Sequence, residues 1–326
     1  MLRIHSIAVL TSGGDSPGMN ACIRAVVRTG ICHGLKTYGI HRGYEGLIEG
    51  DIRELQSLDV SNIIQRGGTI LKTARSDRFK TADGMAKAGD NLRRYKIDAL
   101  VAIGGDGTFR GAKEFSAKYR IPVIGIPGTI DNDLYGTDFT IGYDTAINTA
   151  VEAIDKIRDT AASHNRLFFI EVMGRDAGLI ALRSGIAGGA EAILVPETRT
   201  DVNTLIEKLR EGWIHNKTSM IVVVAEGDEI GGAFKVAERV KKEFDYYDIR
   251  VTVLGHLQRG GTPTAMDRVL ASRLGVAAVE GLLKGKKNVM AGVVHQDIVF
   301  VPFSKAVKHH RDINPHLLKI AEILAK

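Results

Sequence analysis

Acidic and hydroxyl-bearing residues gather in two short segments that each follow an apolar run. GGDGT (104–108) follows residues 99–103, and PGTIDND (127–133) follows residues 123–126. In an open α/β sheet, ligands bind at the carboxyl ends of the strands, so both segments are expected to open into one crevice. Glycines free backbone N–H groups to face phosphate oxygens, whereas an aspartate needs an intervening metal ion or a proton to remove. The pair therefore predicts phosphoryl-transfer chemistry.

The two segments suit different tasks, although each also has a simpler explanation. In the first, the amides of Gly105 and Gly107 can approach a polyphosphate while Asp106 reaches a magnesium ion that bridges its oxygens. In the second, a carboxylate of Asp131 or Asp133 can take the proton from an attacking hydroxyl. The alternatives are a helix N-cap of Asp or Thr in the first segment and an Asx-rich turn in the second.

A third glycine-rich segment, TSGGDSPGMN (11–20), follows the apolar run 7–10 and precedes a helical pattern. A glycine turn at a helix N-terminus binds anions, because free N–H groups and the positive end of the helix dipole face the ligand. The segment matches neither GxGxxG nor GxxxxGK[ST], which argues against a dinucleotide enzyme and a Walker-type ATPase. The alternative is a tight turn in which Asp15 or Ser16 caps the helix.

Basic residues also bracket expected strands. MGR (173–175) and HLQRGG (256–261) follow strands, Arg166 and Arg250 precede the same two strands, and Glu226 ends another. Arginine suits bidentate phosphate recognition. Together these residues predict a pocket for a phosphorylated sugar.

The elements that must position these residues alternate between strand and helix. Strands are expected at 7–10, 99–103, 123–126, 167–172, 192–195, 220–225, 251–254 and 289–294, and helices at 19–32, 84–95, 107–119, 144–158, 201–215, 233–244 and 264–283. The pattern predicts an α/β fold with two lobes, each with a mainly parallel central sheet flanked by helices. We expect the first break between lobes near Asp144.

Composition narrows the class of protein. The chain has 326 residues, a net charge of +6 and 6% aromatic residues, and its basic residues are scattered, so an anionic small substrate explains the charge at least as well as a nucleic acid does. Cys22 and Cys32 are too few for a disulfide framework or a zinc site, and we expect a reducing cytoplasm. No stretch approaches the roughly 18 apolar residues of a membrane span, so a membrane is not expected as a partner. A nucleic acid is not expected either, because the basic residues are scattered.

Taken in this order, TSGGDSPGMN, IGGDGT, PGTIDND, EVMGRDAG, AEG and LGHLQRGG resemble the ATP-dependent 6-phosphofructokinases of bacterial type, over nearly the whole chain. The resemblance implies an allosteric, cytoplasmic, homotetrameric transferase of glycolysis. This kinase makes fructose 1,6-bisphosphate and ADP from D-fructose 6-phosphate and ATP. It also implies the phosphofructokinase fold, with an ATP-binding lobe of residues 1–142 plus 258–308 and a sugar-phosphate lobe of residues 143–257 plus 309–326.

The resemblance assigns roles by position. Asp131 resembles the catalytic base that takes the proton of the sugar 1-hydroxyl, while Thr129 and Arg175 steady the transferring phosphoryl group. The nucleotide residues would be Gly14, Arg75, Ser76, Gly105, Asp106, Gly107 and Thr108, with Asp106 on Mg²⁺. The substrate residues would be Thr129, Ile130, Asp131, Arg166, Met173, Gly174, Arg175, Glu226, Arg250, His256, Leu257, Gln258 and Arg259, of which Arg166 and Arg250 reach across a subunit interface to the 6-phosphate.

Two glycines bear on the phosphoryl donor. Relatives that use pyrophosphate carry an aspartate at the position of Gly107 and a lysine at that of Gly128. Both glycines are expected to leave room for the α-phosphate of a nucleotide, which favours ATP. The alternatives kept open are a pyrophosphate-dependent phosphofructokinase and a catalytically inactive regulatory subunit that binds a sugar phosphate or a nucleotide.

The effector pocket of the family, for ADP or phosphoenolpyruvate, matches Arg24, Arg28, Arg158, Gly189, Glu191 and Lys217. Basic residues common at three further positions are replaced here by Ser57, His215 and Thr218. Lost positive charge weakens the attraction for a polyanion, so we expect weaker or altered effector control.

Overall fold

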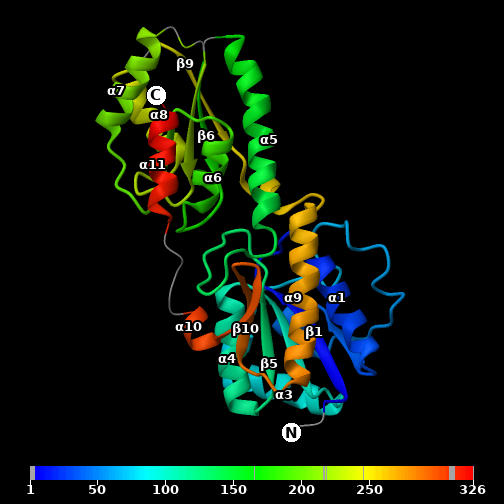
Figure 1. Cartoon of the computed structure of the whole chain (residues 1–326). Helices are drawn as coiled ribbons and strands as arrows, with labels where there is room; N and C mark the ends of the chain where they lie inside the picture. Colours follow the sequence, from blue (N-terminus) through cyan, green and yellow to red (C-terminus); the bar gives the residue numbers. More distant parts are fainter. Residues whose placement is uncertain are drawn as a thin grey trace. The chain divides into compact units, whose positions relative to one another are not determined.

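The chain divides into two compact units in the computed structural model, which describes residues 4–164, 166–215, 217, 219–244, 246–307 and 313–325 (Figure 1). Unit 1 comprises Met1–Thr145 and Arg259–Arg311, and unit 2 comprises Ala146–Gln258 and Asp312–Lys326. Each unit has its own sheet, and parallel pairs predominate in both. The expected α/β class is confirmed.

Unit 1 is built on a seven-stranded sheet with the order β11-β10-β5-β4-β1-β2-β3. The strands are β1 (Ser6–Ser12), β2 (Lys36–Ile40), β3 (Ile52–Glu54), β4 (Ala99–Gly104), β5 (Val123–Pro127), β10 (Val289–Val294) and β11 (Asp297–Pro302). The interior strands pair in parallel, whereas the edge strands β3 and β11 are antiparallel to their neighbours. The loops after β1, β4 and β5 therefore leave the same end of the sheet, as the motif positions require.

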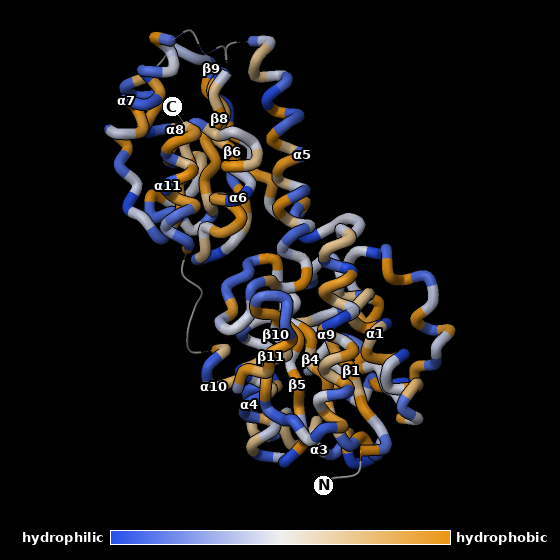
Figure 2. The backbone as a smooth tube through the Cα atoms, viewed as in Figure 1, coloured by the Kyte–Doolittle hydropathy of each residue, from blue (hydrophilic) through white to orange (hydrophobic). Residues whose placement is uncertain are grey.

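Both faces of this sheet are covered, which explains why its central strands read as continuous apolar runs (Figure 2). Along β1, Ile7 and Val9 pack into one cluster while Ala8 and Leu10 pack into the other. The first cluster lies beneath α1 (Met19–Cys32) and α9 (Ala265–Leu283). The second lies beneath α2 (Gly43–Glu49), α3 (Ala82–Arg94), α4 (Asp106–Tyr119) and α10 (Phe303–Ala306), and a 3₁₀ helix, η1 (Arg78–Lys80), adds Phe79.

Unit 2 is built on a four-stranded parallel sheet with the order β7-β8-β6-β9. Its strands are β6 (Arg166–Val172), β7 (Ala192–Leu194), β8 (Met220–Ala225) and β9 (Asp248–Val253). The helices are α5 (Tyr143–Ala162), which begins at the end of the first segment of unit 1, α6 (Leu179–Ala187), α7 (Val202–Ile214), α8 (Ala233–Lys241) and α11 (Pro315–Leu324). A short 3₁₀ helix, η2 (Gly255–Arg259), follows β9.

All eight expected strands and all seven expected helices are present, with ends that differ by a few residues. The largest difference is at α5, which ends at Ala162 where the pattern ends at residue 158. The sequence pattern missed β2 and β3, which are short and lack a continuous apolar run, and it also missed β11, although residues 298–301 of that strand are apolar throughout. No described helix combines the length and apolarity that a bilayer span needs.

Candidate active site

The turn after β1 is shaped by glycines and not by a capping side chain. Gly13 has φ +89° and Gly18 has φ +105°, and Gly18 is the N-cap of α1 without any side-chain cap hydrogen bond. The alternative in which Asp15 or Ser16 caps this helix is therefore wrong. Met19 N donates to the carbonyl of Ser16 at 3.2 Å, and no side chain caps the N–H groups that follow it in the first turn of α1.

Arg259 lies directly against this turn. Its Nη1 donates to the carbonyl oxygen of Asp15 at 3.1 Å, and a Cβ at Gly14 would lie 2.4 Å from the same nitrogen. Only a residue without a side chain lets the guanidinium approach so closely. A residue predicted to bind the sugar phosphate thus places its charge beside the turn predicted to bind the nucleotide.

The GGDGT segment joins the end of β4 to α4. Gly105 is the N-cap without a side-chain bond, so the N-cap alternative is wrong here too. Thr108 Oγ1 donates to the carbonyl of Ser12 at 2.9 Å, which ties this segment to the end of β1. A Cβ at position 104 would lie 2.4 Å from the same carbonyl oxygen, so the segment and β1 can approach this closely only with glycine there.

Asp106 has one engaged and one unengaged carboxylate oxygen. Its Oδ2 accepts from Arg110 Nε at 2.8 Å, while its Oδ1 is buried and has no hydrogen-bond partner in the described part of the chain. A carboxylate oxygen left over in this way is a suitable ligand for a hard cation such as Mg²⁺, which typically takes one or two carboxylates and completes its shell with phosphate and water. Among the described residues, no group of three or more His, Cys, Asp or Glu side chains could hold a metal ion.

The segment that carries Arg75 is held against the glycine turn by residues that the sequence analysis did not single out. Asn20 donates to the carbonyls of Arg66 and Gly67 at 3.1 Å each and accepts from Ile70 N at 2.7 Å. Thr73 Oγ1 donates to the carbonyl of Gly13 at 2.9 Å. These bonds place the exposed Arg75 on a chain that is fixed to the turn.

Ser76, predicted to contact the nucleotide, uses its hydroxyl within the protein. Its Oγ donates to Glu45 Oε2 at 2.5 Å and accepts from Phe79 N at 3.1 Å. Arg78 pairs with the other oxygen of Glu45. Glu45 therefore fixes the start of η1, and a nucleotide contact from Ser76 would have to come from its backbone or from a shared hydroxyl.

The PGTIDND segment forms an ordered loop that returns to the sheet. Gly128 N donates to the carbonyl of Gly104 at 3.0 Å, which holds the second acidic segment beside the first. Asp131 is 1% exposed, and its N–H donates to Thr129 Oγ1 at 3.2 Å. Asn132, at φ +54°, accepts from Thr140 N at 2.8 Å, so this residue spans the loop and does more than close a turn.

In unit 2, Glu226 holds the turn that carries Arg175. Its Oε1 accepts from Gly174 N at 3.2 Å and from Arg175 N at 2.7 Å. Arg175 has φ +53°, a left-handed conformation that costs a non-glycine residue about 1–2 kcal/mol. Gln258, fully buried, accepts from Met173 N at 2.8 Å, so Met173, Gly174, Arg175, Glu226 and Gln258 come together in unit 2.

Arg166 and Arg250 share one carboxylate that the sequence analysis missed. Asp248 Oδ2 accepts from Arg166 Nε at 3.2 Å and from Arg250 Nε and Nη2 at 3.0 and 2.8 Å. The hydrogen bond from Arg250 is the main reason that the pKa of Asp248 lies below its usual value. The spacing of Asp248 and Arg250, two residues apart on β9, would have indicated that both point to the same side of the strand.

The remaining substrate residues divide between the units. His256 and Leu257 belong to unit 2 and are exposed on η2, while Arg259 and the 129–131 segment belong to unit 1. Ile130 is buried in the interior of unit 1. Each set is well defined within its own unit.

The predicted effector residues are likewise split. In unit 2, Arg158 Nη2 donates to the carbonyls of Gly188 and Gly189 at 2.7 and 2.6 Å, and Lys217 lies near Tyr247, which bonds its carbonyl. In unit 1, partial burial and then repulsion from Arg28 lower the pKa of Arg24. Ser57 and His215 are exposed, and Thr218 lies outside the described residues.

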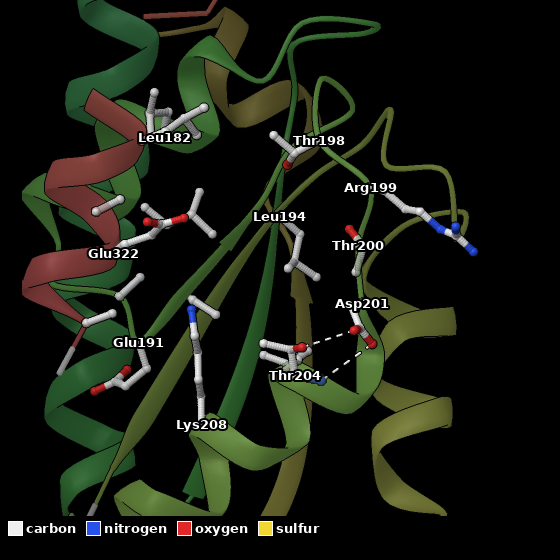
Figure 3. Close-up of a pocket in the computed structure, with 17 residues that line it drawn as sticks. Leu182, Glu191, Leu194, Thr198, Arg199, Thr200, Asp201, Thr204, Lys208 and Glu322 are labelled. Atoms are coloured by element: carbon white, nitrogen blue, oxygen red, sulfur yellow. Dashed lines mark hydrogen bonds between the residues drawn. The ribbon is translucent and has the colours of Figure 1, made fainter. Parts of the chain in front are cut away.

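Glu191 lines a cavity of about 270 Å³ in unit 2, between β7, the start of α7 and α11 (Figure 3). Glu191 Oε2 accepts from Ile221 N at 2.6 Å. Lys208 and Glu322 also line this cavity, and Asp201 there caps α7 through Asn203 N. Its wall is as much apolar as polar, with Leu194 and Leu318 among the lining side chains.

The comparison with known proteins decides the family. A family model described as Phosphofructokinase matches residues 6–282. The chain belongs to the phosphofructokinase family. The curated ATP-dependent 6-phosphofructokinase 2 of Bacteroides thetaiotaomicron is 58% identical over 325 residues, which cover 100% of this chain and 100% of that protein.

Solved phosphofructokinases share the fold. The crystal structure of Pichia pastoris phosphofructokinase in the T-state has a TM-score of 0.88 at 37% identity, and the match covers 94% of this chain and 36% of that one. The pyrophosphate-dependent phosphofructokinase of Marinobacter aquaeolei has a TM-score of 0.85 at 26% identity, covering 96% and 86%. Since a pyrophosphate-dependent enzyme shares the fold so closely, the fold itself does not distinguish ATP from pyrophosphate.

The two glycines expected to mark the donor differ in their surroundings. A Cβ at Gly107 would meet nothing within 4 Å, as expected. At Gly128, a Cβ would lie 2.9 Å from Ile103 Cγ2 and 3.1 Å from Met19 Cε. Gly128 is therefore a packing glycine of the phosphofructokinase fold in this chain, and the structural argument about the donor rests on Gly107.

Proposed function

We propose that this chain is an ATP-dependent 6-phosphofructokinase that transfers the γ-phosphoryl group of ATP to the 1-hydroxyl of D-fructose 6-phosphate. The products are fructose 1,6-bisphosphate and ADP, and the reaction is the committed step of glycolysis. The observation that carries the proposal is the backbone bond from Gly128 to Gly104, which holds the Asp131 and Asp106 segments side by side at the ends of β5 and β4.

The nucleotide side of the reaction falls to the β1 and β4 loops. The glycine turn 13–18 and the start of α4 present backbone N–H groups to the phosphates, and Arg75 and Arg259 supply positive charge. Asp106 Oδ1 would hold Mg²⁺, which neutralises charge on the phosphate oxygens when it is bound. Arg110 orients Asp106 by holding its other oxygen.

The chemical step falls to the β5 loop and to Arg175. Asp131 takes the proton of the 1-hydroxyl as that oxygen forms its bond to the γ-phosphorus, and the bond to the β–γ bridging oxygen breaks, so ADP leaves. Thr129 and Arg175 stabilise charge on the transferred group. Asp131 is almost fully buried, so little bulk water reaches its carboxylate.

Sugar recognition falls to unit 2. Glu226 and Gln258 shape the Met173–Arg175 turn, and His256, Arg166 and Arg250 provide groups for the sugar and its 6-phosphate. The homotetramer, the cytoplasmic location and control by ADP or phosphoenolpyruvate through Arg24, Arg28, Arg158, Gly189, Glu191 and Lys217 remain predictions of the sequence.

The proposal is tested with the purified chain, Mg²⁺, fructose 6-phosphate and γ-labelled ATP, and with the Asp131→Ser variant. With the wild type, we expect the label to appear at the 1-position of the sugar. With Asp131→Ser, we expect kcat to fall about 100-fold or more while ATP binding is unchanged. No sugar phosphorylation by the wild type would indicate the regulatory-subunit alternative.

A further inference from the structure

The carboxylate of Asp267 joins the N-termini of two helices and the end of the loop that carries the PGTIDND segment, residues 128–142 between β5 and α5. It is fully buried, although it belongs to the first turn of α9, far in sequence from the acidic motifs. Its Oδ1 accepts from Gly142 N at 2.8 Å, and its Oδ2 accepts from Thr145 N at 2.8 Å and from Thr145 Oγ1 at 2.5 Å. Thr145 belongs to the first turn of α5, and Gly142 directly precedes that helix.

The local sequence would predict another use for this side chain. Thr264 and Asp267 have the spacing of a capping box, in which the acidic residue bonds back to the N–H of the N-cap residue. Only half of the box forms, since Asp267 N donates to Thr264 Oγ1 at 3.2 Å. Thr264 N donates instead to Thr145 Oγ1 at 3.1 Å, which leaves the Asp267 carboxylate to α5.

The bonds between the two helices are reciprocal. Thr264 Oγ1 donates to Asp144 Oδ2 at 2.6 Å, while Asp267 receives the N–H groups of α5. A negative charge at a helix N-terminus is stabilised by the helix dipole, and here one carboxylate faces two such ends. Burial raises the pKa of Asp267, and the bonds from Thr145 and Gly142 oppose that rise.

The loop that carries Asp131 is tied down at its start, its middle and its end. At its start, Gly128 N donates a hydrogen bond to the carbonyl of Gly104, and in its middle Asn132 Oδ1 accepts one from Thr140 N. Next to its end, Ile141 N donates to the carbonyl of Pro127 at 2.8 Å. The last residue of the loop, Gly142, has φ +101°, and its N–H donates to Asp267 Oδ1.

We propose that Asp267 is a positioning residue for the phosphoryl-transfer step, because it anchors the return of the Asp131 loop to the starts of α5 and α9. The inference rests on the proposed function, in which Asp131 is the general base. Asp267 touches neither substrate nor nucleotide, and it acts through the place that it gives to Asp131. A misplacement of a reacting group by about 1 Å costs on the order of 100-fold in rate.

The test is a double-mutant cycle on kcat with Asp267→Asn and Asp131→Ser. Asparagine keeps the shape but puts an N–H₂ group against the donors of Thr145 or Gly142. In the wild-type background, we expect Asp267→Asn to lower kcat about 10- to 100-fold while KM for each substrate changes by less than about 3-fold. In the Asp131→Ser background, where the base is already missing, we expect the same change to lower kcat by less than about 3-fold.

Asp201→Asn is the matched control. Asp201 also accepts a backbone N–H and a threonine hydroxyl at a helix start, from Asn203 N at 2.9 Å and Thr204 Oγ1 at 3.0 Å, but it lies on α7 of unit 2. Its kcat should equal that of the wild type. If Asp267→Asn does not fold, Thr145→Val removes one of the three bonds, and we expect an intermediate loss of kcat that Thr145→Ser restores.

The outcomes separate the two claims. An equal loss from Asp267→Asn in both backgrounds would show a purely structural role and overturn the inference while leaving the proposed function intact. Full turnover by Asp131→Ser alone would instead overturn the assigned base, and with it the positioning role. Both claims are supported if Asp267→Asn lowers kcat strongly in the wild-type background and only slightly in the Asp131→Ser background.

Discussion

Glu226 provides a sharp prediction because its carboxylate holds a turn that is otherwise unfavourable. The bonds from Gly174 N and Arg175 N keep Arg175 at φ +53°. In Glu226→Gln, the side-chain oxygen can still accept, but the bonds lose their charge assistance. A hydrogen bond to a charged group contributes about 1.5–3 kcal/mol and a neutral one about 0.5–1.5 kcal/mol.

The difference over two bonds is about 2–3 kcal/mol, which is more than the roughly 1–2 kcal/mol that the left-handed conformation of Arg175 costs. We therefore expect the turn to relax and Arg175 to leave its place. Because about 1.4 kcal/mol corresponds to tenfold, kcat/KM for fructose 6-phosphate should fall about 30- to 100-fold. The assay is steady-state kinetics with ATP, paired with urea unfolding of the same preparations.

The matched control is Glu171→Gln. Glu171, on β6 of the same sheet, also accepts a backbone N–H, from Ala233 at 2.8 Å, but it belongs to no predicted site. It should lose a comparable amount of stability while kcat/KM stays within about 3-fold of the wild type. If Glu226→Gln and Glu171→Gln had the same kinetics, the claim that Glu226 positions Arg175 would be refuted.

Three further predictions follow from unit 1. Asp106→Asn should raise the Mg²⁺ concentration needed for half-maximal activity about 10-fold or more, since the carboxylate loses its charge at Oδ1. Arg110→Gln removes only the partner of Oδ2 and should have a smaller effect. Equal Mg²⁺ dependence in the two variants would contradict the assignment. Gly107→Asp should fold with wild-type stability, because a Cβ at this position meets nothing within 4 Å, but it should lose turnover with ATP. Gly128→Ala should lower the free energy of unfolding in urea by about 1–3 kcal/mol, because its Cβ would contact Ile103. The reverse order of stabilities would be inconsistent with the packing. Asn20→Ala leaves Ile70 N and the carbonyls of Arg66 and Gly67 without their partner, so KM for ATP should rise several-fold as the Arg75 segment loosens, and an unchanged KM would show that this segment is held by other contacts.

Much of the fold could be predicted because the central strands are covered on both faces. Residues such as Ile7 to Leu10 are apolar without a break, so their run is easy to recognise. The edge strand β3 has three residues and gives no such signal, whereas β11 was missed although its residues 298–301 are apolar. The local motifs of the site could be predicted for a similar reason, since each is a short contiguous segment at a strand end.

The residues that organise the site could not be predicted, because they act over long sequence distances. Asp267 bonds residues 142 and 145, Asn20 bonds residues 66–70, and Asp248 joins Arg166 to Arg250. Only the folded chain brings such pairs together. The same limit applies to Gly128, because the atoms that a Cβ there would meet belong to Ile103 and Met19, which are far from it in sequence.

The central claim is that this chain phosphorylates fructose 6-phosphate with ATP, and parallel turnover with the two possible donors tests it most directly. With Mg²⁺ and fructose 6-phosphate held constant, the rate of fructose 1,6-bisphosphate formation is measured with ATP in one series and with pyrophosphate in the other. We predict turnover with ATP and none above background with pyrophosphate. Turnover with pyrophosphate alone would contradict the account and make the pyrophosphate-dependent alternative correct.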